Sequence, residues 1–413
     1  MMNTRRFAAL LIVGFAGIGC AAPPSSATPT LPPPTETPPS PTVTTAPTPA
    51  VTPTATQTYQ QVQATAIRAL LNLIPGEATD VCEWNEQRIL CDEQGYIIRL
   101  DLWARGLTRL HPRIADLERL EFLDLRDNSL TSLPPEIGQL SHLQYLLVDD
   151  NHLTSLPPEV GQLSSLRSLS IDNNDLKSLP PEIGHLDSLQ YLFAGSNDLT
   201  TLPPEIGQLS NLEILRVGYN DGIDLPPEVG QLSNLTDLGL DGCNLSELPV
   251  EVTQLHRLEY LWLAANNLTT LPPEIDQLAS LIHLDVRDND LTSLPPEIGQ
   301  LPSLGILYLD DNKLTNLPPE IGQLSNLGTL SISDNRLRDL PPEIGQLVNL
   351  RDIDLSGNKG IHLPIEFSQL SGLTRLELND CGLASLPLEI TQLSSLEDLF
   401  LSSNSLAELL DFW

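Results

Sequence analysis

Leucines recur along most of the chain with a constant period of 23 in the numbering. Each unit begins with an alternating phrase, xxLxL, which is followed by a polar turn and by the phrase LPPEIGQLxxL. Leu120 and Leu396 are separated by twelve such periods (396 − 120 = 12 × 23), with no insertion or deletion. A regular period of this size predicts a solenoid, in which stacked units bury one continuous core. The leucines that open successive units are Leu120, Leu143, Leu166, Leu189, Leu212, Leu235, Leu258, Leu281, Leu304, Leu327, Leu350, Leu373 and Leu396.

Two elements are predicted in each unit. Alternation over xxLxL predicts a β-strand, which turns leucines such as Leu123 and Leu125 inward and leaves the residues between them outside. The LPPE phrase predicts a short helical turn, since proline suits a first helical turn and a carboxylate is favoured beside its free N–H groups. One column of glutamates is therefore interpreted as structural: Glu136, Glu159, Glu182, Glu205, Glu228, Glu251, Glu274, Glu297, Glu320, Glu343, Glu366 and Glu389.

An asparagine follows the strand in most units. We expect these amides to be buried in register and to hydrogen-bond with the backbone of neighbouring units. Cys243 and Cys381 replace the asparagine in two units that lie six periods apart (381 − 243 = 6 × 23), which suggests the duplication of a six-unit block. Adjacent strands lie about 4.8 Å apart, and a disulfide needs a Cα separation below about 7 Å. Cysteines on strands six repeats apart are therefore too far from each other to form a disulfide, and both are predicted to be buried free thiols.

The unit LxxLxLxxNxLxxLPxxIxxLxx resembles the leucine-rich repeat family. The resemblance implies an α/β solenoid: a horseshoe with a parallel, concave β-sheet and short helical, 3-10 or extended segments on its convex side. We assign residues 97–413 to this solenoid, as one degenerate, twelve regular and one partial repeat. Fourteen strands at about 4.8 Å would line an arc of roughly 65 Å.

Residues 1–20 have the pattern of an export signal. Two arginines precede an apolar run that is too short to span a membrane, and small residues lead to Cys20. The ending Gly-Ile-Gly-Cys resembles a bacterial lipobox, although Gly17 stands where leucine is usual. Cys20 is therefore the predicted lipidation site, and an ordinary signal peptide with an incidental cysteine is the alternative. We expect an exported protein, anchored by lipid at the outer face of the cell membrane or envelope.

Residues 21–57 consist almost entirely of proline, threonine, alanine and serine, and Glu36 is their only charged residue. Such a composition cannot bury a core and predicts a disordered stalk. Prolines keep a segment of this kind extended at about 3.1 Å per residue, so the stalk would reach on the order of 100 Å.

Residues 58–96 are predicted to cap the solenoid, whose apolar end needs a cover. A helix is expected over residues 59–74, because apolar residues share one helical face. The sequence from Cys82 to Leu102 resembles the N-terminal cap of plant-type extracellular leucine-rich repeat proteins. That resemblance implies a Cys82–Cys91 disulfide in an exported chain, although these cysteines are farther apart than usual. The apolar face comprises Val62, Ile67, Leu70, Leu71 and Ile74.

Charge and motifs limit the possible functions. The chain has 21 basic and 54 acidic residues, a net charge of −33, which disfavours nucleic acid and anionic membrane surfaces as partners. A cationic protein or peptide, a polysaccharide or a metal ion is compatible with this charge. The sequence has no CxxC pair, HExxH, GxSxG or nucleotide-binding fingerprint. We therefore predict no enzyme, no cofactor and no metal site.

Aromatic residues mark the candidate binding surface. The leucines are required by the core, so the residues between and just after them are free to carry specificity. Aromatics are enriched at binding hot spots, and we predict a protein or glycan ligand centred on Tyr191, Phe193, Tyr219, Tyr260 and Trp262. The alternative is that aromatics simply suit strands and stack between repeats. The predicted ligand-binding residues are Tyr145, Tyr191, Phe193, Tyr219, Tyr260, Trp262 and Tyr308.

Acidic residues flank these aromatics at the strand ends. They indicate either a solvated rim that favours cationic partners or a calcium site. The residues are Asp127, Asp149, Asp150, Asp172, Asp288, Asp310, Asp311 and Asp334.

Three functions follow from the sequence in order of preference. The first is a cell-surface recognition module that binds a protein or glycan through its concave face. The second is a structural or adhesive surface protein. The third is an intracellular-type signalling scaffold, such as a regulator of a small GTPase, and the export signal disfavours it.

Overall fold

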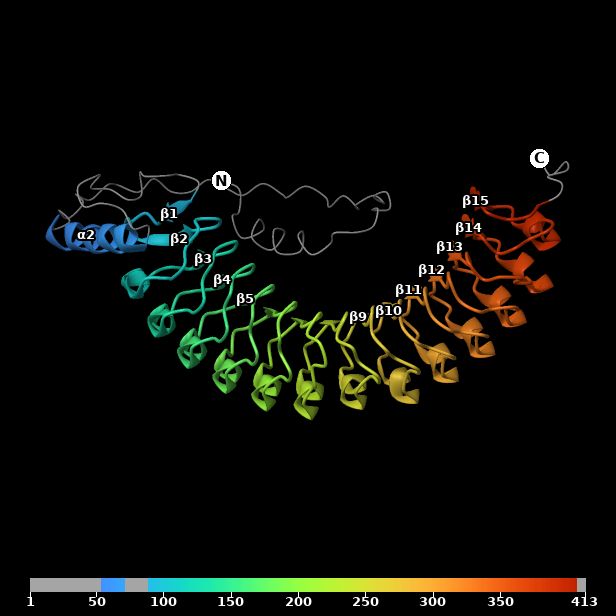
Figure 1. Cartoon of the computed structure of the whole chain (residues 1–413), viewed down its shortest axis with the longest axis horizontal. Helices are drawn as coiled ribbons and strands as arrows, with labels where there is room; N and C mark the ends of the chain where they lie inside the picture. The colour runs from blue at the N-terminus through green and yellow to red at the C-terminus, as the bar shows by residue number, and fades with distance from the viewer. Residues whose placement is uncertain (1–52, 71–87, 407–413) are drawn as a thin grey trace, which may run out of the picture. The chain divides into compact units, whose positions relative to one another are not determined.

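The computed structural model describes residues 53–70 and 88–406 (Figure 1). They form one unit with a helix, a single sheet and a series of short 3-10 helices. Among the described residues, no helix is long and apolar enough to cross a membrane. The predicted signal peptide, its Cys20, residues 21–52 of the stalk and Cys82 lie outside the described residues, so their assignments stay predictions.

Helix α2 runs from Pro53 to Leu70. It begins before the expected start at Tyr59, and residues 53–57, which composition assigned to the stalk, lie in the helix. Proline is compatible with a first helical turn, where its missing N–H has no partner to lose. The stalk boundary at residue 57 was therefore wrong. Leu71 and Ile74, predicted on the apolar face of this helix, lie outside the described residues.

One face of α2 covers the N-terminal end of the core. Ile67 is fully buried, whereas Val62, which was expected on the same face, is 38% exposed. Gln63 occupies the buried face instead: its Oε1 accepts a hydrogen bond from Ile97 N at 2.7 Å, and its Nε2 donates to Gly95 O at 3.3 Å. A buried amide is tolerated here because both of its polar atoms are hydrogen-bonded.

Strand β1 (Ile89–Cys91) pairs antiparallel with β2 (Ile97–Asp101). A tight turn joins the two strands, with Gly95 at a φ of +82° and its N–H bonded to Asp92 O at 3.0 Å. So short a connection permits only antiparallel pairing. The sequence predicted β2 alone, because β1 is three residues long and has no leucine-rich repeat pattern. The Cys82–Cys91 disulfide stays a prediction.

Strands β2–β15 are all parallel and follow the order of the sequence, so each repeat adds one strand to the growing sheet. Every pair from β2 to β15 is in register at a shift of one repeat period, as in Leu123 beside Leu146. The bounds are β3 Phe122–Asp124, β4 Tyr145–Leu147, β5 Ser168–Ser170, β6 Tyr191–Phe193, β7 Ile214–Arg216, β8 Asp237–Gly239, β9 Tyr260–Trp262, β10 His283–Asp285, β11 Ile306–Tyr308, β12 Thr329–Ser331, β13 Asp352–Asp354, β14 Arg375–Glu377 and β15 Asp398–Phe400.

Each repeat returns through a one-turn 3-10 helix. In most of these helices proline precedes and occupies the first position, and the glutamate lies in the first turn, as predicted. A Cβ on Gly138 would overlap the carbonyl oxygen of Glu159 in the next repeat, so glycine permits close stacking of these turns. The bounds are η2 Pro112–Asp116, η3 Pro135–Gln139, η4 Pro158–Gln162, η5 Pro181–His185, η6 Pro204–Gln208, η7 Pro227–Gln231, η8 Val250–Gln254, η9 Pro273–Gln277, η10 Pro296–Gln300, η11 Pro319–Gln323, η12 Pro342–Gln346, η13 Ile365–Gln369 and η14 Leu388–Gln392.

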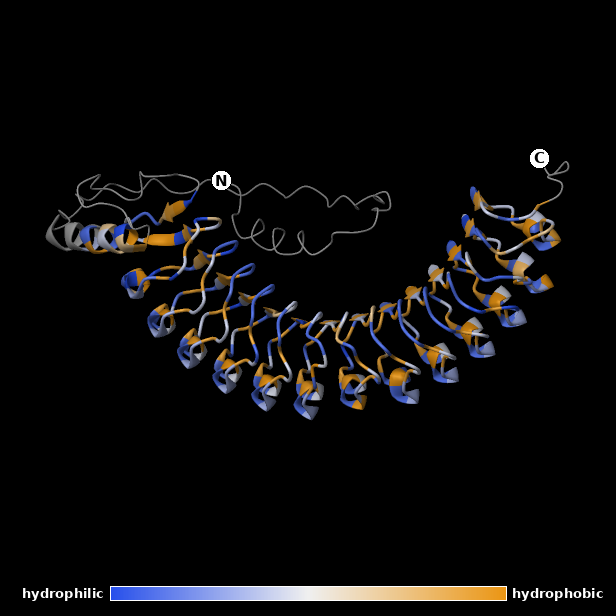
Figure 2. Ribbon diagram, in the orientation of Figure 1, coloured by the Kyte–Doolittle hydropathy of each residue, from blue (hydrophilic) through white to orange (hydrophobic). Residues whose placement is uncertain are grey.

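The core lies between the sheet and the 3-10 helices. Leu123 and Leu125 are fully buried, and a single cluster of leucines, isoleucines and valines runs through every repeat. Strands line the inner side of an arc and 3-10 helices line its outer side (Figure 1). Hydrophobic positions are present on both sides of each repeat (Figure 2). The expected α/β solenoid, a horseshoe with a parallel concave sheet, is therefore confirmed.

The asparagine ladder also forms. Asn312, which is 7% exposed, donates through Nδ2 to Val286 O at 2.9 Å in the preceding repeat, and its Oδ1 accepts from Leu291 N at 2.9 Å. Cys243 and Cys381 occupy the same position as buried free thiols, as predicted. Burial raises the pKa of each thiol to about 11, so both stay protonated and unreactive near neutral pH.

Candidate ligand-binding surface

The concave surface is built from two columns of outward-facing positions. In strands β3–β15 the central leucine or isoleucine points toward the core and its two neighbours point out, as Tyr260 and Trp262 do on either side of the buried Leu261. Since one strand recurs per period and neighbouring strands are in register, equivalent side chains lie next to one another across the sheet. The variable residues of the sequence therefore form one continuous face.

Six of the seven predicted binding residues lie on this face. Tyr145 belongs to β4, Tyr191 and Phe193 to β6, Tyr260 and Trp262 to β9, and Tyr308 to β11. Tyr219 does not. It lies in the turn after β7 at a φ of +58°, is 62% exposed, and places its ring where a Cβ on Gly242 would be 2.5 Å away. Tyr219 therefore lies at the edge of the sheet, in the turn just after the strand, and its part in binding stays a prediction.

The predicted centre is also divided in two. Strands β7 and β8 separate the aromatics of β6 from those of β9, a distance of roughly 14 Å at the usual strand spacing. The intervening outward positions carry Ile214, Arg216, Asp237 and Gly239. Arg216 pairs with Asp237 through Nη2 at 2.7 Å. One ion pair thus occupies the middle of the surface that was expected to be aromatic.

The densest aromatic group is centred on a histidine that sequence reasoning missed. The ring centroid of His283 lies 4.4 Å from that of Trp262, 5.3 Å from that of Tyr308 and 6.3 Å from that of Tyr260. We call these four residues the His283 cluster. His283 occupies the position equivalent to Tyr260 in the next repeat. Comparing the residues at this strand position across all repeats would have revealed His283, since histidine also has a flat ring.

Two arginines lie at the sides of the His283 cluster. The guanidinium of Arg216 lies 5.7 Å from the Trp262 ring centroid, and that of Arg287 lies 4.8 Å from the Tyr308 ring centroid. Each is also paired with a carboxylate, and Arg287 donates to the buried Asp285 at 2.6 Å. This hydrogen bond raises the pKa of Arg287. The cations therefore hold the rings by cation–π contact without giving the cluster a net positive charge.

Two polar atoms in the His283 cluster have no partner. Within the described residues, Trp262 Nε1 and His283 Nε2 are buried and form no hydrogen bond. Burial lowers the pKa of His283 below its usual range, so the ring is neutral near neutral pH. Leaving such groups unpaired costs about 1–3 kcal/mol each. Both atoms have almost no accessible surface, so a group on the concave side could pair with them only after the surrounding rings shift.

The predicted acidic rim consists of two structural sets. Asp149, Asp172 and Asp310 each accept a hydrogen bond from a backbone N–H of the next repeat, as Asp172 Oδ1 does from Gly195 N at 2.6 Å. The others adopt positive φ near +50°, a conformation that aspartate tolerates. They are Asp127, Asp150, Asp288, Asp311 and Asp334. In the described part of the chain, no group of three His, Cys, Asp or Glu residues is placed to hold a metal ion.

Comparison with known proteins establishes the family. A model described as "Leucine-rich repeat region" matches residues 98–175, 158–239 and 250–333, and one described as "Leucine rich repeat" matches residues 325–383. Together they span most of the solenoid, and the chain belongs to the leucine-rich repeat family. A comparison with curated proteins finds no match.

Solved structures with a similar fold come from bacteria and plants. A leucine-rich repeat protein of Leptospira interrogans is 38% identical with a TM-score of 0.64, over 75% of this chain and 91% of that one. The ectodomain of the Arabidopsis thaliana receptor kinase GASSHO1/SCHENGEN3, in complex with CASPARIAN STRIP INTEGRITY FACTOR 2, is 31% identical with a TM-score of 0.67, over 85% of this chain and 44% of that one. The plant peptide hormone receptor RGFR1, in complex with RGF2, is 29% identical with a TM-score of 0.57, over 79% of this chain and 57% of that one.

Proposed function

We propose that the protein is an exported recognition module that binds a protein ligand on its concave surface, with the His283 cluster at the centre. The observation that carries the proposal is the aromatic group itself, in which the rings of Tyr260, Trp262 and Tyr308 surround His283 on neighbouring strands of the concave face. A ligand packed on these strands would cover the rings and remove their apolar surface from water. The free protein lacks this stabilisation, so the gain in free energy arises only when the ligand is bound.

The residues around the His283 cluster suit this role. Tryptophan, tyrosine and arginine are the side chains that most often dominate interface energies, and here they lie on a sheet in which neighbouring strands are paired throughout. Since the backbone is already ordered, binding costs little conformational entropy. The two plant receptors of similar fold were solved with protein or peptide factors bound, which supports a protein ligand over a glycan at this surface.

A basic segment of the ligand is expected beyond β12. The outward positions of β13–β15 include Asp352, Asp354, Glu377 and Asp398, and only Arg375 among them is basic. Burial raises the pKa values of Asp352 and Asp354, and the neighbouring carboxylates add to this effect. A lysine or arginine of the ligand would relieve the repulsion between these groups. This part of the surface therefore favours a cationic partner.

Attachment at the cell surface is part of the same proposal. Cys20 would carry the lipid and residues 21–52 would form the stalk that lifts the solenoid from the membrane. The sequence pattern of residues 1–20 supports export.

Photo-crosslinking on the cells that produce the protein would test the concave site. One variant of the full-length chain carries a photoreactive residue at Thr329, on β12 next to β11, and the matched control carries it at Gln323, on the convex η11 that precedes the same strand. We expect a discrete crosslinked protein from Thr329 and none from Gln323. Replacing both Tyr260 and Trp262 by alanine should remove that product.

Two results would contradict the proposal. Crosslinking that survives the loss of Tyr260 and Trp262 would show that the His283 cluster is not the centre of binding. Equal crosslinking from both positions, with many products, would favour the structural or adhesive role, in which the solenoid has no dedicated ligand face.

A further inference from the structure

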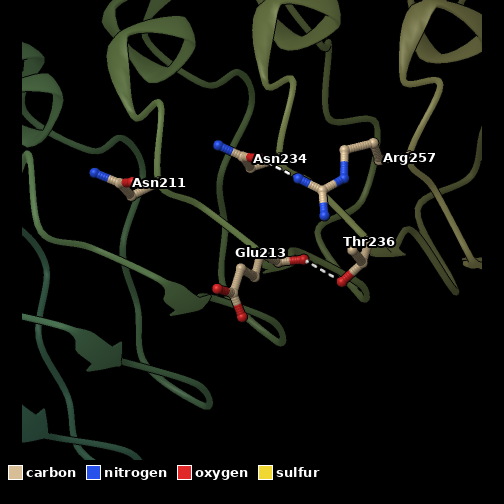
Figure 3. Close-up of a pocket in the computed structure, with 5 residues that line it drawn as sticks. All are labelled: Asn211, Glu213, Asn234, Thr236 and Arg257. Atoms are coloured by element: carbon tan, nitrogen blue, oxygen red, sulfur yellow. Dashed lines mark hydrogen bonds between the residues drawn. The ribbon is translucent and has the colours of Figure 1, made fainter.

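A polar pocket lies beside the concave surface, where the chain enters β7, β8 and β9. It has a volume of about 370 Å³ and is lined by Asn211, Glu213, Asn234, Thr236 and Arg257, which come from three successive repeats (Figure 3). None of these residues belongs to the His283 cluster. The volume lies at the lower end of the range of about 300–1,000 Å³ for small-molecule sites.

The two asparagines of the pocket are fixed by the backbone. Asn211 Nδ2 donates to Asp187 O at 2.8 Å, and Asn234 Nδ2 donates to Ser210 O at 2.7 Å. Because each amide is held by its nitrogen, each presents its oxygen as an acceptor. Arg257 Nη1 donates to Asn234 Oδ1 at 2.6 Å, as Figure 3 shows. The guanidinium is thus positioned at the pocket with further N–H groups available.

The remaining hydrogen-bonding capacity is mixed. Arg257 offers donors, and Asn211 Oδ1 and the Glu213 carboxylate offer acceptors; the Thr236 hydroxyl, which already donates to Glu213 O at 3.1 Å, can still accept. Among the described residues, the Glu213 carboxylate has one hydrogen bond, a long one of 3.5 Å from Tyr191 OH. The charges of Arg257 and Glu213 cancel. A simple anion would be repelled by Glu213 and a simple cation by Arg257. Groups that both donate and accept without charge, namely hydroxyls, match this set.

Two tyrosines contact residues of the pocket: the Tyr191 hydroxyl donates to the Glu213 carboxylate, and Tyr260 N donates to Thr236 O at 2.9 Å. Tyr191 lies on the β6 side, where its hydroxyl meets Glu213, and Tyr260, which is 37% exposed, lies on β9 shortly after Arg257. Aromatic rings have a negative face, and the C–H groups of a sugar ring carry partial positive charge. Hydroxyl-binding groups with tyrosines on neighbouring strands therefore fit a saccharide better than a peptide side chain.

The equivalent position six repeats further on is closed. Six repeats further on, the equivalents of Glu213, Asn234 and Arg257 are Arg351, Gly372 and Ser395. There the Arg351 guanidinium lies directly against Gly372, where a Cβ would overlap it, and so fills the space. Stacking of repeats alone therefore does not produce the open pocket; this particular set of residues does.

We propose that this pocket is a second binding site, which takes one or two neutral sugar units of a glycan. It would act independently of the concave protein site, since the two share no lining residue. A glycan-bearing surface could then be held at the side of the sheet while the concave face is occupied.

Titration with free sugars tests the proposal on the whole chain. The probes are maltose, cellobiose, lactose and diacetylchitobiose, with glucuronate as an anionic comparison, followed by saturation-transfer NMR and calorimetry. We expect at least one neutral disaccharide to bind at or below about 10 mM. Arg257→Ala and Glu213→Gln should each weaken that binding at least roughly tenfold. Arg351→Ala, at the closed equivalent position, should leave it unchanged.

Three outcomes would overturn the proposal: no binding of any neutral probe, binding that survives both pocket substitutions, or tighter binding of glucuronate. Melting curves of the variants separate a lost site from a lost fold, and Arg257 is exposed, so its removal leaves the core intact. Because the titration contains no protein ligand, a negative result does not bear on the His283 cluster. A negative crosslinking result likewise does not bear on the pocket.

Discussion

Cys243 and Cys381 replace an asparagine, and the residues that contact them change in step. In regular repeats the asparagine Oδ1 accepts the N–H of a leucine in the preceding repeat, as Asn220 does from Leu199 at 2.9 Å. A thiol cannot supply that oxygen. At the leucine position the chain instead has Gly222, at a φ of +71°, whose N–H reaches the backbone oxygen of Cys243 at 3.0 Å.

The same exchange occurs six repeats later. Gly360, at a φ of +73°, donates its N–H to Cys381 O at 2.8 Å. In both places a buried isoleucine, Ile223 or Ile361, follows the glycine and fills the core. At both places the cysteine and the glycine therefore changed together, which accounts for their shared offset of six periods. The sequence showed the coincidence, but the physical reason required the turn geometry, since positive φ favours glycine.

Buried carboxylates make the free energy of unfolding depend on pH. Burial raises the pKa of Asp172 to about 7, and the nearby Asp149 adds to the shift. The folded state then holds a proton that the unfolded state, with a pKa near 4, has lost. Between these values the folded state binds more protons, so the free energy of unfolding falls as pH rises from about 4 to about 7 and stays reduced above that range.

Asp172→Asn should remove much of this dependence. The amide keeps an oxygen to accept the Gly195 N–H bond but carries no charge. We expect the variant to melt at a higher temperature than the wild type at about pH 8 and to show a shallower decline between about pH 4 and pH 7. The measurement is the melting temperature as a function of pH, with the exposed Asp198→Asn as the control. Parallel curves for Asp172→Asn and the wild type would contradict the assignment.

At the scale of elements, helix α2 stabilises the first repeat by packing rather than by length. Ile67 is fully buried against the solenoid, and Val62 on the neighbouring face is 38% exposed. We expect Ile67→Ala to lower the free energy of unfolding by about 2–4 kcal/mol, as for other buried isoleucines, and Val62→Ala to change it by less than about 0.5 kcal/mol. Denaturant titration of both variants is the measurement. Equal effects would mean that Val62 shares the packed face with Ile67.

Elements were predicted well where the repeat imposes them and poorly where it does not. The period placed the parallel strands, the 3-10 turns and the asparagine ladder, because each must recur for the core to close. It gave no information on β1, which follows from a single tight turn, or on the start of α2. For the site, it identified the strand aromatics but missed His283. Side-chain direction and ring packing across neighbouring strands depend on the three-dimensional register.

At the scale of the whole molecule, each repeat contacts only its neighbours. The sheet pairs in sequence order from β1 to β15, so each internal strand is bonded to the ones before and after it. Stability is then close to a sum of repeat and interface terms. Removing whole repeats should shorten the solenoid without changing its fold, provided that the register between repeats is kept.

Deletion of residues 213–350 tests this expectation. The deletion removes six whole periods (350 − 212 = 6 × 23), joins Leu212 to Arg351 and brings β6 next to β13. We expect a folded protein with unchanged secondary structure per residue. Its denaturant m value should fall by roughly 40%, in proportion to the share of the solenoid surface that is lost. It should also lose the protein ligand, since the His283 cluster is gone.

A deletion that breaks the register provides the control. Removing residues 213–338 retains a longer chain but joins Leu212 to Asp339, which lies in the segment leading to η12 rather than at a strand. Apolar and polar positions are then out of phase with the preceding repeat, and the asparagine ladder is interrupted. We expect this longer chain to be less stable than the shorter one. Stability that followed length instead would show that in-register stacking is not what holds the solenoid together.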